Sequence, residues 1–475
     1  MATFDIAVVG GTVVGHGPGP VDLGISGGRI AAIGEDLAGD AAEVIDARGM
    51  LVLPGAVDAH FHIGIYRDLA TDAESETRSA LAGGTTTVLS YFRTGHNYLD
   101  KTGPYAEILP EVLAKTAGNA RADYGYHLAP MNRGHVDEVR ALADEGGVTS
   151  FKYYMFYKGM NLAGDSRDAQ GYTLSDSYDL GHLLEIMEQV ATANAATPGR
   201  RVSLSIHCEQ PELIRVFQER VAKEGRLSGL HAYSEARPPL TERLAVTEAG
   251  VLAAASRCPV NLLHLSSDQA LAAATKVRRE NPGLDVRAET TLHHLALTYD
   301  RYPDQRGKVN PPIRAQHDLE SLWSGVLSGD IDWIVSDHAC CGEEHKEGDL
   351  WSAWPGFGGT ALLYPFLLTE GVRRGLSVER VVELVATNPA RAYGLAPRKG
   401  AIAVGADADL AVADPNTPRA VTPETLVSAQ EYTPFEGMEL VGWPVRTLLR
   451  GRTVFADGEA VGEPAGEFLK RPLPT

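Results

Sequence analysis

The chain has 475 residues, of which 44% are hydrophobic, so it is long enough for a large buried core and for more than one domain. Its 62 acidic residues outnumber 43 basic ones, and the net charge of −19 argues against nucleic acid or an anionic membrane as a partner. The sequence contains no apolar run near the roughly 18 residues of a membrane span, and its four cysteines form no CxxC pair. Since the N-terminal segment also lacks the features of a signal peptide, we expect a cytoplasmic protein.

The first part of the chain reads as short β-segments separated by glycine turns. Residues 4–11 (FDIAVVGG) are apolar and show no helical period. Residues 10–15 (GGTVVG) suggest a nucleotide-binding loop, but they lack the GxGxxG spacing and no helical pattern follows, which favours a hairpin turn. Because β-character returns after about residue 400, we expect one β-sandwich domain made from residues 1–54 and 396–475.

Between residues 55 and 395, apolar segments alternate with helical stretches. Helical periodicity is found at residues 74–82, 135–143, 212–225 and 271–280. The apolar segments are residues 56–63, 85–92, 124–130, 148–155, 202–209, 260–267, 286–295 and 331–339. Near-continuous hydrophobicity is typical of strands buried on both faces. Eight such strands alternating with helices predict an α/β protein with a TIM-like (β/α)₈ barrel.

Ionisable side chains lie at or just past the carboxyl ends of the strands expected in five of these segments. They are His60, His62, Lys152, His207, His264 and Asp337. The first two are two residues apart, so a strand directs both toward the same face. In a barrel, the carboxyl ends of the strands meet at one mouth, where active sites lie. A lone histidine at a strand end is more often structural, but four imidazoles and a carboxylate at matching ends indicate a metal site.

Lys152 is an unusual member of this set, because an ammonium group cannot ligate a cation. Reaction with CO₂ would convert the amine to a carbamate, whose two oxygens could bridge two divalent ions. The alternative is an ordinary ion pair with an acid near the barrel mouth. Spacing alone does not distinguish these two interpretations.

Several motifs make the chain resemble the cyclic amidohydrolases, a group that includes D-hydantoinase, dihydropyrimidinase, allantoinase and dihydroorotase. The motifs extend from about residue 50 to 471 and include LPGAVDAHFH, SFKYYMFYKG, IHCE, LLHLSS, NPPIR, VSDHACC and the FLKR tail. The resemblance implies that Lys152 is carboxylated and bridges two divalent metal ions. The ligands implied for one ion are His60, His62 and Asp337, and those for the other are His207 and His264. Zn²⁺ suits this ligand set, which would also accept Mn²⁺ or Co²⁺.

The same resemblance implies a small cyclic amide as substrate, a homotetrameric assembly and attack by a metal-activated hydroxide. Asp337 would take the proton and return it to the leaving nitrogen. Tyr157 matches the tyrosine that hydantoinases direct at the oxyanion, although it could be an aromatic packing residue. Asn310 matches a position that grips the amide edge of the ring, and Gly356 begins a GFGG stretch that matches a backbone-binding loop; either could be an ordinary turn. We expect a structural role for His338.

The motifs do not agree on one substrate. Gly64 stands where dihydroorotase-like enzymes carry an arginine, which disfavours dihydroorotate, whereas VNPPIR looks like dihydroorotases. Tyr157 and the FLKR tail favour a hydantoinase or dihydropyrimidinase, and DHACCGEEHK looks like allantoinases. We therefore expect a hydrolase of the hydantoinase or dihydropyrimidinase type, with an allantoinase- or dihydroorotase-like activity as the alternative. Some relatives are non-catalytic tetrameric scaffolds that have lost metal ligands, and retention of all six disfavours that role here.

Overall fold

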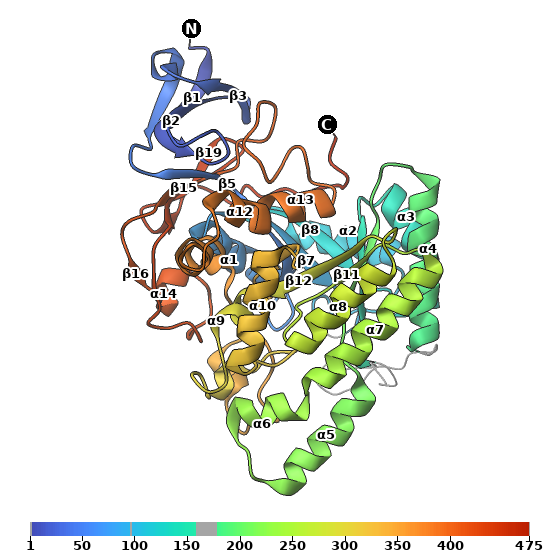
Figure 1. The fold of residues 1–475 in the computed structure, drawn as a ribbon. Coiled ribbons are helices and arrows are strands. Elements are labelled where there is room, and N and C mark those ends of the chain that lie inside the picture. The colour runs from blue at the N-terminus through green and yellow to red at the C-terminus, as the bar shows by residue number, and fades with distance from the viewer. Residues whose placement is uncertain (1, 96, 158–177, 475) are drawn as a thin grey trace.

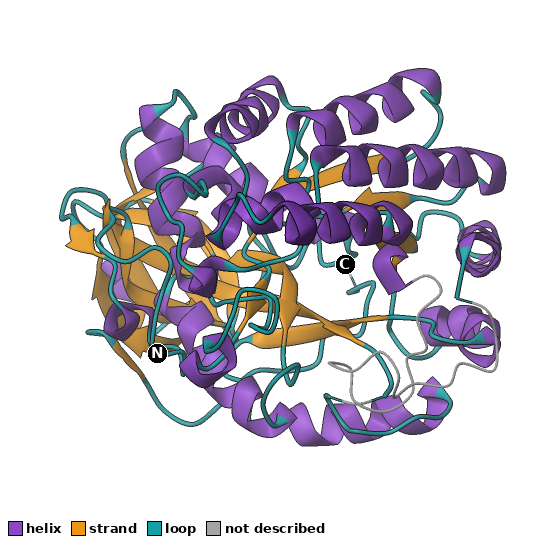
Figure 2. Cartoon of the chain, turned by 90° about the horizontal axis from the view of Figure 1, so that it is seen from below, coloured by secondary structure: helices purple, strands orange, loops and turns teal. Residues whose placement is uncertain are grey.

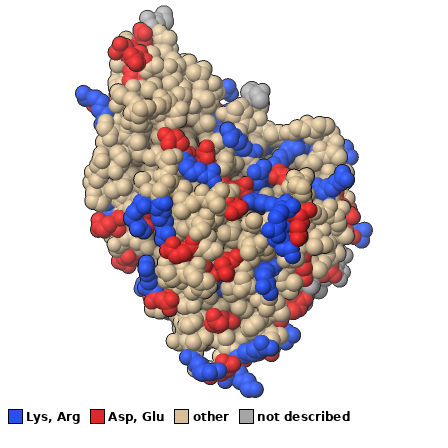
Figure 3. Space-filling view, in the orientation of Figure 1, with Lys and Arg blue, Asp and Glu red and all other residues tan. Residues whose placement is uncertain are grey.

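The computed structural model describes residues 2–95, 97–157 and 178–474. Lys158 and Gly159, which end the motif SFKYYMFYKG, lie outside the described residues. Among the residues that are described, no helix is both long enough and apolar enough to cross a membrane. On the face shown in Figure 3, the described acidic and basic side chains are interspersed rather than separated into patches.

A closed parallel sheet forms the centre of the larger domain, with helices packed around it (Figure 2). In the described part of the chain its strands are β6 (Ala56–His62), β7 (Thr85–Phe92), β8 (Asp123–Leu128), β9 (Ser150–Tyr154), β10 (Ser203–His207), β11 (Val260–Leu262), β12 (Val286–Thr291), β13 (Trp333–Val335) and β14 (His338–Ala339). β13 and β14 are the two halves of the eighth predicted segment: β13 pairs with β12, and β14 pairs with β6. The predicted (β/α)₈ barrel is therefore confirmed, and its last strand is broken at Ser336 and Asp337.

Helices follow the strands on the outside of the barrel. The longer ones are α1 (Leu69–Ala82), α2 (Tyr105–Thr116), α3 (Arg133–Asp144), α4 (Leu180–Ala196), α5 (Pro211–Glu224), α6 (Gly229–Ala236), α7 (Pro239–Ser256), α8 (Asp268–Glu280) and α10 (Gln316–Ser328). The four predicted helical stretches coincide with α1, α3, α5 and α8. Side chains cap the first turns of α1 and α8: Asp68 accepts from two amides at the start of α1, and Ser267 accepts from the amide of Ala270 at α8. In Figure 1, α5 and α6 project at the end of the molecule opposite the β-rich domain.

Two local predictions need correction. The seventh apolar segment was expected to be one strand through residue 295, but β12 ends at Thr291, whose side chain caps the short helix α9 (Leu292–Ala296). A threonine cap competes with continued strand pairing, so the apolar run contains two elements. The hairpin turn expected at residues 10–15 begins at Val14, because Gly10 and Gly11 lie at a bulge inside the first strand.

The two chain termini together build the smaller β domain, as predicted. Its main sheet contains β1 (Phe4–Val13), β2 (Pro20–Ser26), β3 (Arg29–Gly34), β4 (Ala41–Asp46), β5 (Leu51–Pro54), β15 (Leu410–Asp414), β18 (Trp443–Leu449), β19 (Arg452–Ala456) and β20 (Glu459–Ala460). The N-terminal and C-terminal parts are joined where β5 pairs antiparallel with β15. The domain boundaries placed after residue 54 and before residue 396 stay a prediction.

A buried lysine links the β domain to the barrel. Lys399 Nζ lies 2.6 Å from Asp123 Oδ2 at the start of β8, 2.7 Å from Asp409 Oδ2 and 3.0 Å from Asp407 Oδ2 just before β15. Burial opposes the charge on this side chain, but the three carboxylates outweigh that effect and hold the pKa of Lys399 above its ordinary value. The cation therefore compensates acidic groups from both domains.

Replacing Lys399 with methionine should lower the free energy of unfolding by about 3–5 kcal/mol, because buried carboxylates then lose their cation. Urea denaturation measures the loss. The control is Lys276→Met, which removes an exposed ammonium 3.8 Å from Glu280 on α8 and should cost at most about 1 kcal/mol. Equal stability of the two variants would contradict the linking role.

Candidate active site

The residues singled out from the sequence line one cavity of about 650 Å³ at the carboxyl ends of the barrel strands. They are His60, His62, Lys152, Tyr157, His207, His264, Asn310, Asp337 and Gly356. These positions span almost 300 residues of sequence, and the closed sheet brings them together. The mouth of the barrel is thus the candidate active site.

Two histidines and an aspartate converge at the centre of this cavity. His60 and His62 lie at the end of β6 on the same side of the strand, and each directs its Nε2 at Asp337 Oδ1, at 3.1 and 3.2 Å. Asp337 lies in the break between β13 and β14, where its φ of 52° is unusual for a residue other than glycine. The ligand atoms of the three lie within 4.8 Å of one another, so they could hold a divalent cation.

A second pair of histidines adjoins this group. His207 ends β10 and His264 follows β11, with ring centroids 4.4 Å apart, and the His264 ring lies 5.3 Å from that of His60. His264 Nδ1 is buried and has no hydrogen-bond partner among the described residues. A buried imidazole nitrogen without a partner is costly in a protein alone, but it is expected in a site that receives a further group. These residues therefore fit a second cation.

Lys152, on β9, is buried beside the same group. Its Nζ lies 4.3 Å from the centroid of the Tyr91 ring and 4.7 Å from that of Tyr154, and no described carboxylate comes within 4.0 Å of it. Burial lowers the pKa of Lys152 to about 7, although Asp337 and Glu289 favour its charged form. Burial therefore favours the neutral amine of this side chain, the form that reacts with CO₂.

Two buried glutamates, which the sequence analysis did not predict, bond His60 and His207 and orient their rings. Glu289 Oε1 lies 2.7 Å from His60 Nδ1, and Glu209 Oε2 lies 2.7 Å from His207 Nε2. Burial raises the pKa of Glu209, but Arg237 and His207 outweigh it and hold that pKa well below its ordinary value. Each carboxylate occupies one ring nitrogen and leaves the other for the site. A glutamate inside an apolar segment was the signal that could have revealed both.

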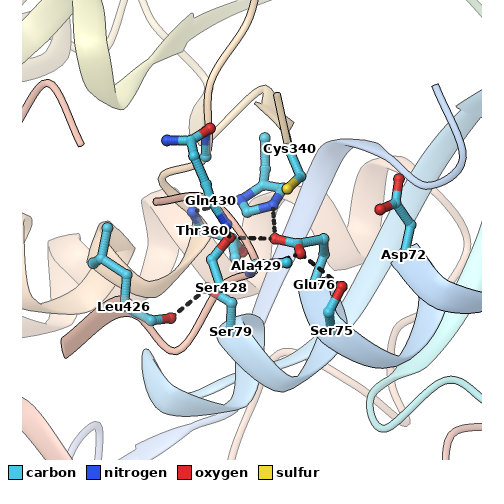
Figure 4. A network of polar contacts seen from close by, with 12 residues as sticks. Asp72, Ser75, Glu76, Ser79, Cys340, Thr360, Leu426, Ser428, Ala429 and Gln430 are labelled. Carbon is cyan, nitrogen blue, oxygen red and sulfur yellow. Dashed lines mark hydrogen bonds and ion pairs between the residues drawn. The ribbon is translucent and has the colours of Figure 1, made fainter. Parts of the chain in front are cut away.

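A polar network fixes the strand that carries Asp337. His338 Nε2 donates to Glu76 Oε2 at 2.7 Å, while its Nδ1 accepts the amide of Gly359, so the ring is held as one neutral tautomer. Glu76, on α1, also accepts the hydroxyl of Ser428 (Figure 4). His338 thus has the structural role expected, and it ties the broken strand to α1 and to the C-terminal segment.

The three predicted substrate-binding residues lie on the wall of the cavity. Tyr157 ends the short turn after β9, and its ring centroid lies 5.0 Å from that of Tyr154. Asn310 Oδ1 accepts the hydroxyl of Tyr233 at 2.6 Å, which orients the side-chain amide. Gly356 has a φ of 108°, and protein groups already bond its amide and its carbonyl. Gly356 therefore shapes the wall through its backbone conformation.

Comparisons with known proteins agree with this arrangement. The model of the amidohydrolase family matches residues 180–454. An allantoinase from Rubrobacter xylanophilus is 34% identical over 99% of this chain and 98% of its own length, and a D-hydantoinase from Ralstonia pickettii is 31% identical over 98% and 99%. A crystal structure of D-hydantoinase superposes with a TM-score of 0.86 at 29% identity, covering 98% of each chain. A dihydropyrimidinase from Brevibacillus agri has a TM-score of 0.85 at 27% identity and covers 98% of each chain. With its barrel, its cavity and these relatives, the chain belongs to the amidohydrolase family.

Proposed function

We propose that this chain is a metal-dependent hydrolase that opens the ring of a small cyclic amide of the hydantoin or dihydropyrimidine type. The observation that carries the proposal is the convergence of His60, His62 and Asp337 at the mouth of the barrel. Buried imidazoles around a carboxylate are a typical donor set for a divalent cation. Membership of the amidohydrolase family, with relatives named D-hydantoinase and allantoinase, supports hydrolysis of a cyclic amide.

Two divalent cations would bind here. His60, His62 and Asp337 would hold one of them, and His207 and His264 would hold the other. Zn²⁺ is the best match to nitrogen and oxygen donors of this kind, and Mn²⁺ or Co²⁺ would also bind. Such cations, when bound, acidify a water molecule and polarise the carbonyl of the substrate.

Lys152 would join the two sets of ligands as a carbamate. The neutral amine attacks CO₂, a nitrogen–carbon bond forms as one C=O π bond opens onto oxygen, and one amine proton passes to water. The product is an anion with two donor oxygens in place of a cation. Burial of Lys152 without a carboxylate partner among the described residues supports this conversion, because an uncompensated ammonium is costly in such a place.

Three other residues would act on the substrate directly. Asp337 accepts a proton from the attacking water and delivers it to the leaving amide nitrogen. Tyr157 donates a hydrogen bond to the oxygen that becomes negative during attack. Asn310, oriented by Tyr233, binds the amide edge of the ring.

A panel of substrates tests the function. Dihydrouracil, a 5-substituted hydantoin, allantoin and dihydroorotate are offered side by side to the metal-loaded protein, and ring opening is followed by chromatography. We expect turnover of the hydantoin or dihydrouracil. Faster turnover of allantoin would support the second candidate, which the allantoinase relatives and the DHACCGEEHK motif favour. Turnover of none of them by a metal-replete protein would refute the proposed substrate class.

We also propose a homotetramer in the cytoplasm, as is usual for proteins with these motifs. Light scattering coupled to gel filtration measures the mass of the assembly. A non-catalytic tetrameric scaffold would have the same mass but would bind no stoichiometric metal and would be unaffected by chelators.

Lys152→Ala should lose most of its metal and its activity, because the bridging anion is absent. A short-chain carboxylic acid supplied in the buffer should restore part of both. Metal analysis and turnover with and without the acid measure the effect, and Lys276→Met is the control. Full activity of Lys152→Ala would refute the carbamate.

Tyr157→Phe should lower kcat by about 10²–10³-fold, as loss of one oxyanion donor does, and should leave the metal content unchanged. Steady-state kinetics and metal analysis on the same preparation separate the two effects. Loss of metal together with activity would instead assign Tyr157 a structural role.

Glu289→Gln should weaken metal binding about 10–100-fold, the usual effect of removing a group that orients a ligand. The glutamate accepts from His60 through one oxygen and from Trp333 through the other, and an amide offers only one acceptor. Competition with a chromophoric chelator measures the affinity. Glu242→Gln is the matched control, since Glu242 is buried but bonds Arg314 and serines rather than a candidate ligand. Equal weakening in both variants would contradict the orienting role.

A further inference from the structure

One wall of the active-site cavity is a long loop between β14 and the turn at Thr360. Residues 342–359, here named the wall loop, contribute Trp351, Trp354 and Gly356 to the lining of the cavity. Apart from one short turn, Glu343–Lys346, the loop has no regular secondary structure. Its carbonyl groups therefore need partners other than a helix or a sheet.

Lys308 supplies three of these partners. It is 4% exposed, and its Nζ donates to the carbonyl oxygens of Leu350, Trp351 and Ala353, at 2.8, 3.0 and 2.5 Å. An ammonium group has three hydrogens, so these bonds use its full donor capacity. A side chain from outside the wall loop thus bonds three carbonyls within residues 350–353 of the loop backbone.

Lys346, which lies inside the wall loop, also donates to carbonyl groups of the loop. It is 2% exposed, and its Nζ donates to the carbonyls of Trp354 and Gly356, at 2.7 and 2.6 Å, and more weakly to that of Lys308 at 3.3 Å. The carbonyl of Lys308 also accepts the amide of Gly356 at 2.9 Å. The two lysines and the cavity-lining end of the loop therefore form one connected unit.

These ammonium groups are held by carbonyl dipoles. In the part of the chain that the structure describes, neither has a carboxylate within 4.0 Å. Burial lowers the pKa of each lysine to about 8. The charged or titratable groups that face Lys308 are Lys346, Arg237 and Asp349. Those that face Lys346 are Cys341 and Asp304. Three carbonyl acceptors favour the charged form, so both are ammonium ions at neutral pH.

Tyr66, in the loop after β6, also contacts the wall loop. Tyr66 donates its hydroxyl to the carbonyl of Pro355 at 2.6 Å, and its ring centroid lies 5.0 Å from that of Trp354. The wall loop is thus held by Tyr66 as well as by the two lysines, and neither lysine bonds a candidate metal ligand.

We propose that Lys308 and Lys346 are positioning residues for substrate recognition, whose ammonium groups hold the wall loop in the conformation that contacts the part of the substrate outside the reacting amide. The identity of that substrate rests on the proposed function, whereas the order of the loop does not. Removing the Lys308 ammonium takes the donor from the carbonyls of Leu350, Trp351 and Ala353. Removing the Lys346 ammonium takes the donor from those of Trp354 and Gly356, and either change frees the loop. The candidate metal ligands, which lie on or directly after the barrel strands, are unchanged.

The test uses Lys308→Met and Lys346→Met in the full chain at pH 7. Hydrogen exchange of the peptide covering residues 343–358 should accelerate by about tenfold or more, because local opening becomes easier. With a 5-substituted hydantoin, KM should rise by about tenfold while kcat stays within about threefold and metal content is unchanged, since one binding surface has been loosened. A merely structural role would lower thermal stability without this division between KM and kcat.

Val190→Ala is the matched control, because it opens a cavity in the buried face of α4 and destabilises the fold away from the wall loop. It should leave exchange of the 343–358 peptide unchanged. If a methionine variant does not fold, the glutamine variant at that position is measured instead. A folded variant with wild-type loop exchange and wild-type KM overturns the proposal. Because the exchange measurement needs no substrate, it decides whether the two lysines order the wall loop even if no cyclic amide is turned over, a result that would count against the proposed function alone.

Discussion

Closure of the parallel sheet by a strand in two pieces is the constraint on which the site depends. β13 pairs with β12 and β14 pairs with β6, so the residues between them leave the ladder. In that gap Asp337 adopts its unusual backbone conformation and presents a carboxylate oxygen to the nitrogens of His60 and His62. Hydrogen bonds from the flanking Ser336 and His338 to buried carboxylates hold both ends of the break. These hydrogen bonds to β6 and α1 therefore hold Asp337 in its unusual conformation.

Burying the histidines of the site costs free energy, and this cost explains why buried glutamates bond two of them. Imidazoles without partners would destabilise the core, but each of two ring nitrogens meets a glutamate. Those glutamates have hydrogen-bond partners of their own, Arg237 for Glu209 and the indole of Trp333 for Glu289. The Nε2 atoms of His60 and His62 both meet Asp337. A rigid set of donors directed at one point is what a tightly bound cation requires.

Reactivity and specificity belong to different parts of this molecule. The candidate metal ligands lie on or directly after barrel strands, which pack on both faces and cannot move far. Much of the remaining cavity lining comes from loops and turns, including the wall loop and the short turn that ends at Tyr157, with further residues from α5 and α6. Loops change more readily than strands, because few packing contacts depend on them. Relatives named for different cyclic amides are expected on such a scaffold.

Much of this could be predicted from the sequence, because alternation of apolar strands with helices and the spacing of His60 and His62 depend on local periodicity. The same local rules place Lys152 on a strand, and the structure has it in the middle of β9. They could not show the break at Asp337, the helix that interrupts the seventh apolar segment or the pairing of Glu289 with His60, since each arises from contacts between segments far apart in the chain. Hydrophobic pattern determined which residues face the barrel interior and its mouth. Only closure of the barrel decided which of those side chains meet, because a polar group buried by one segment must find its partner on another.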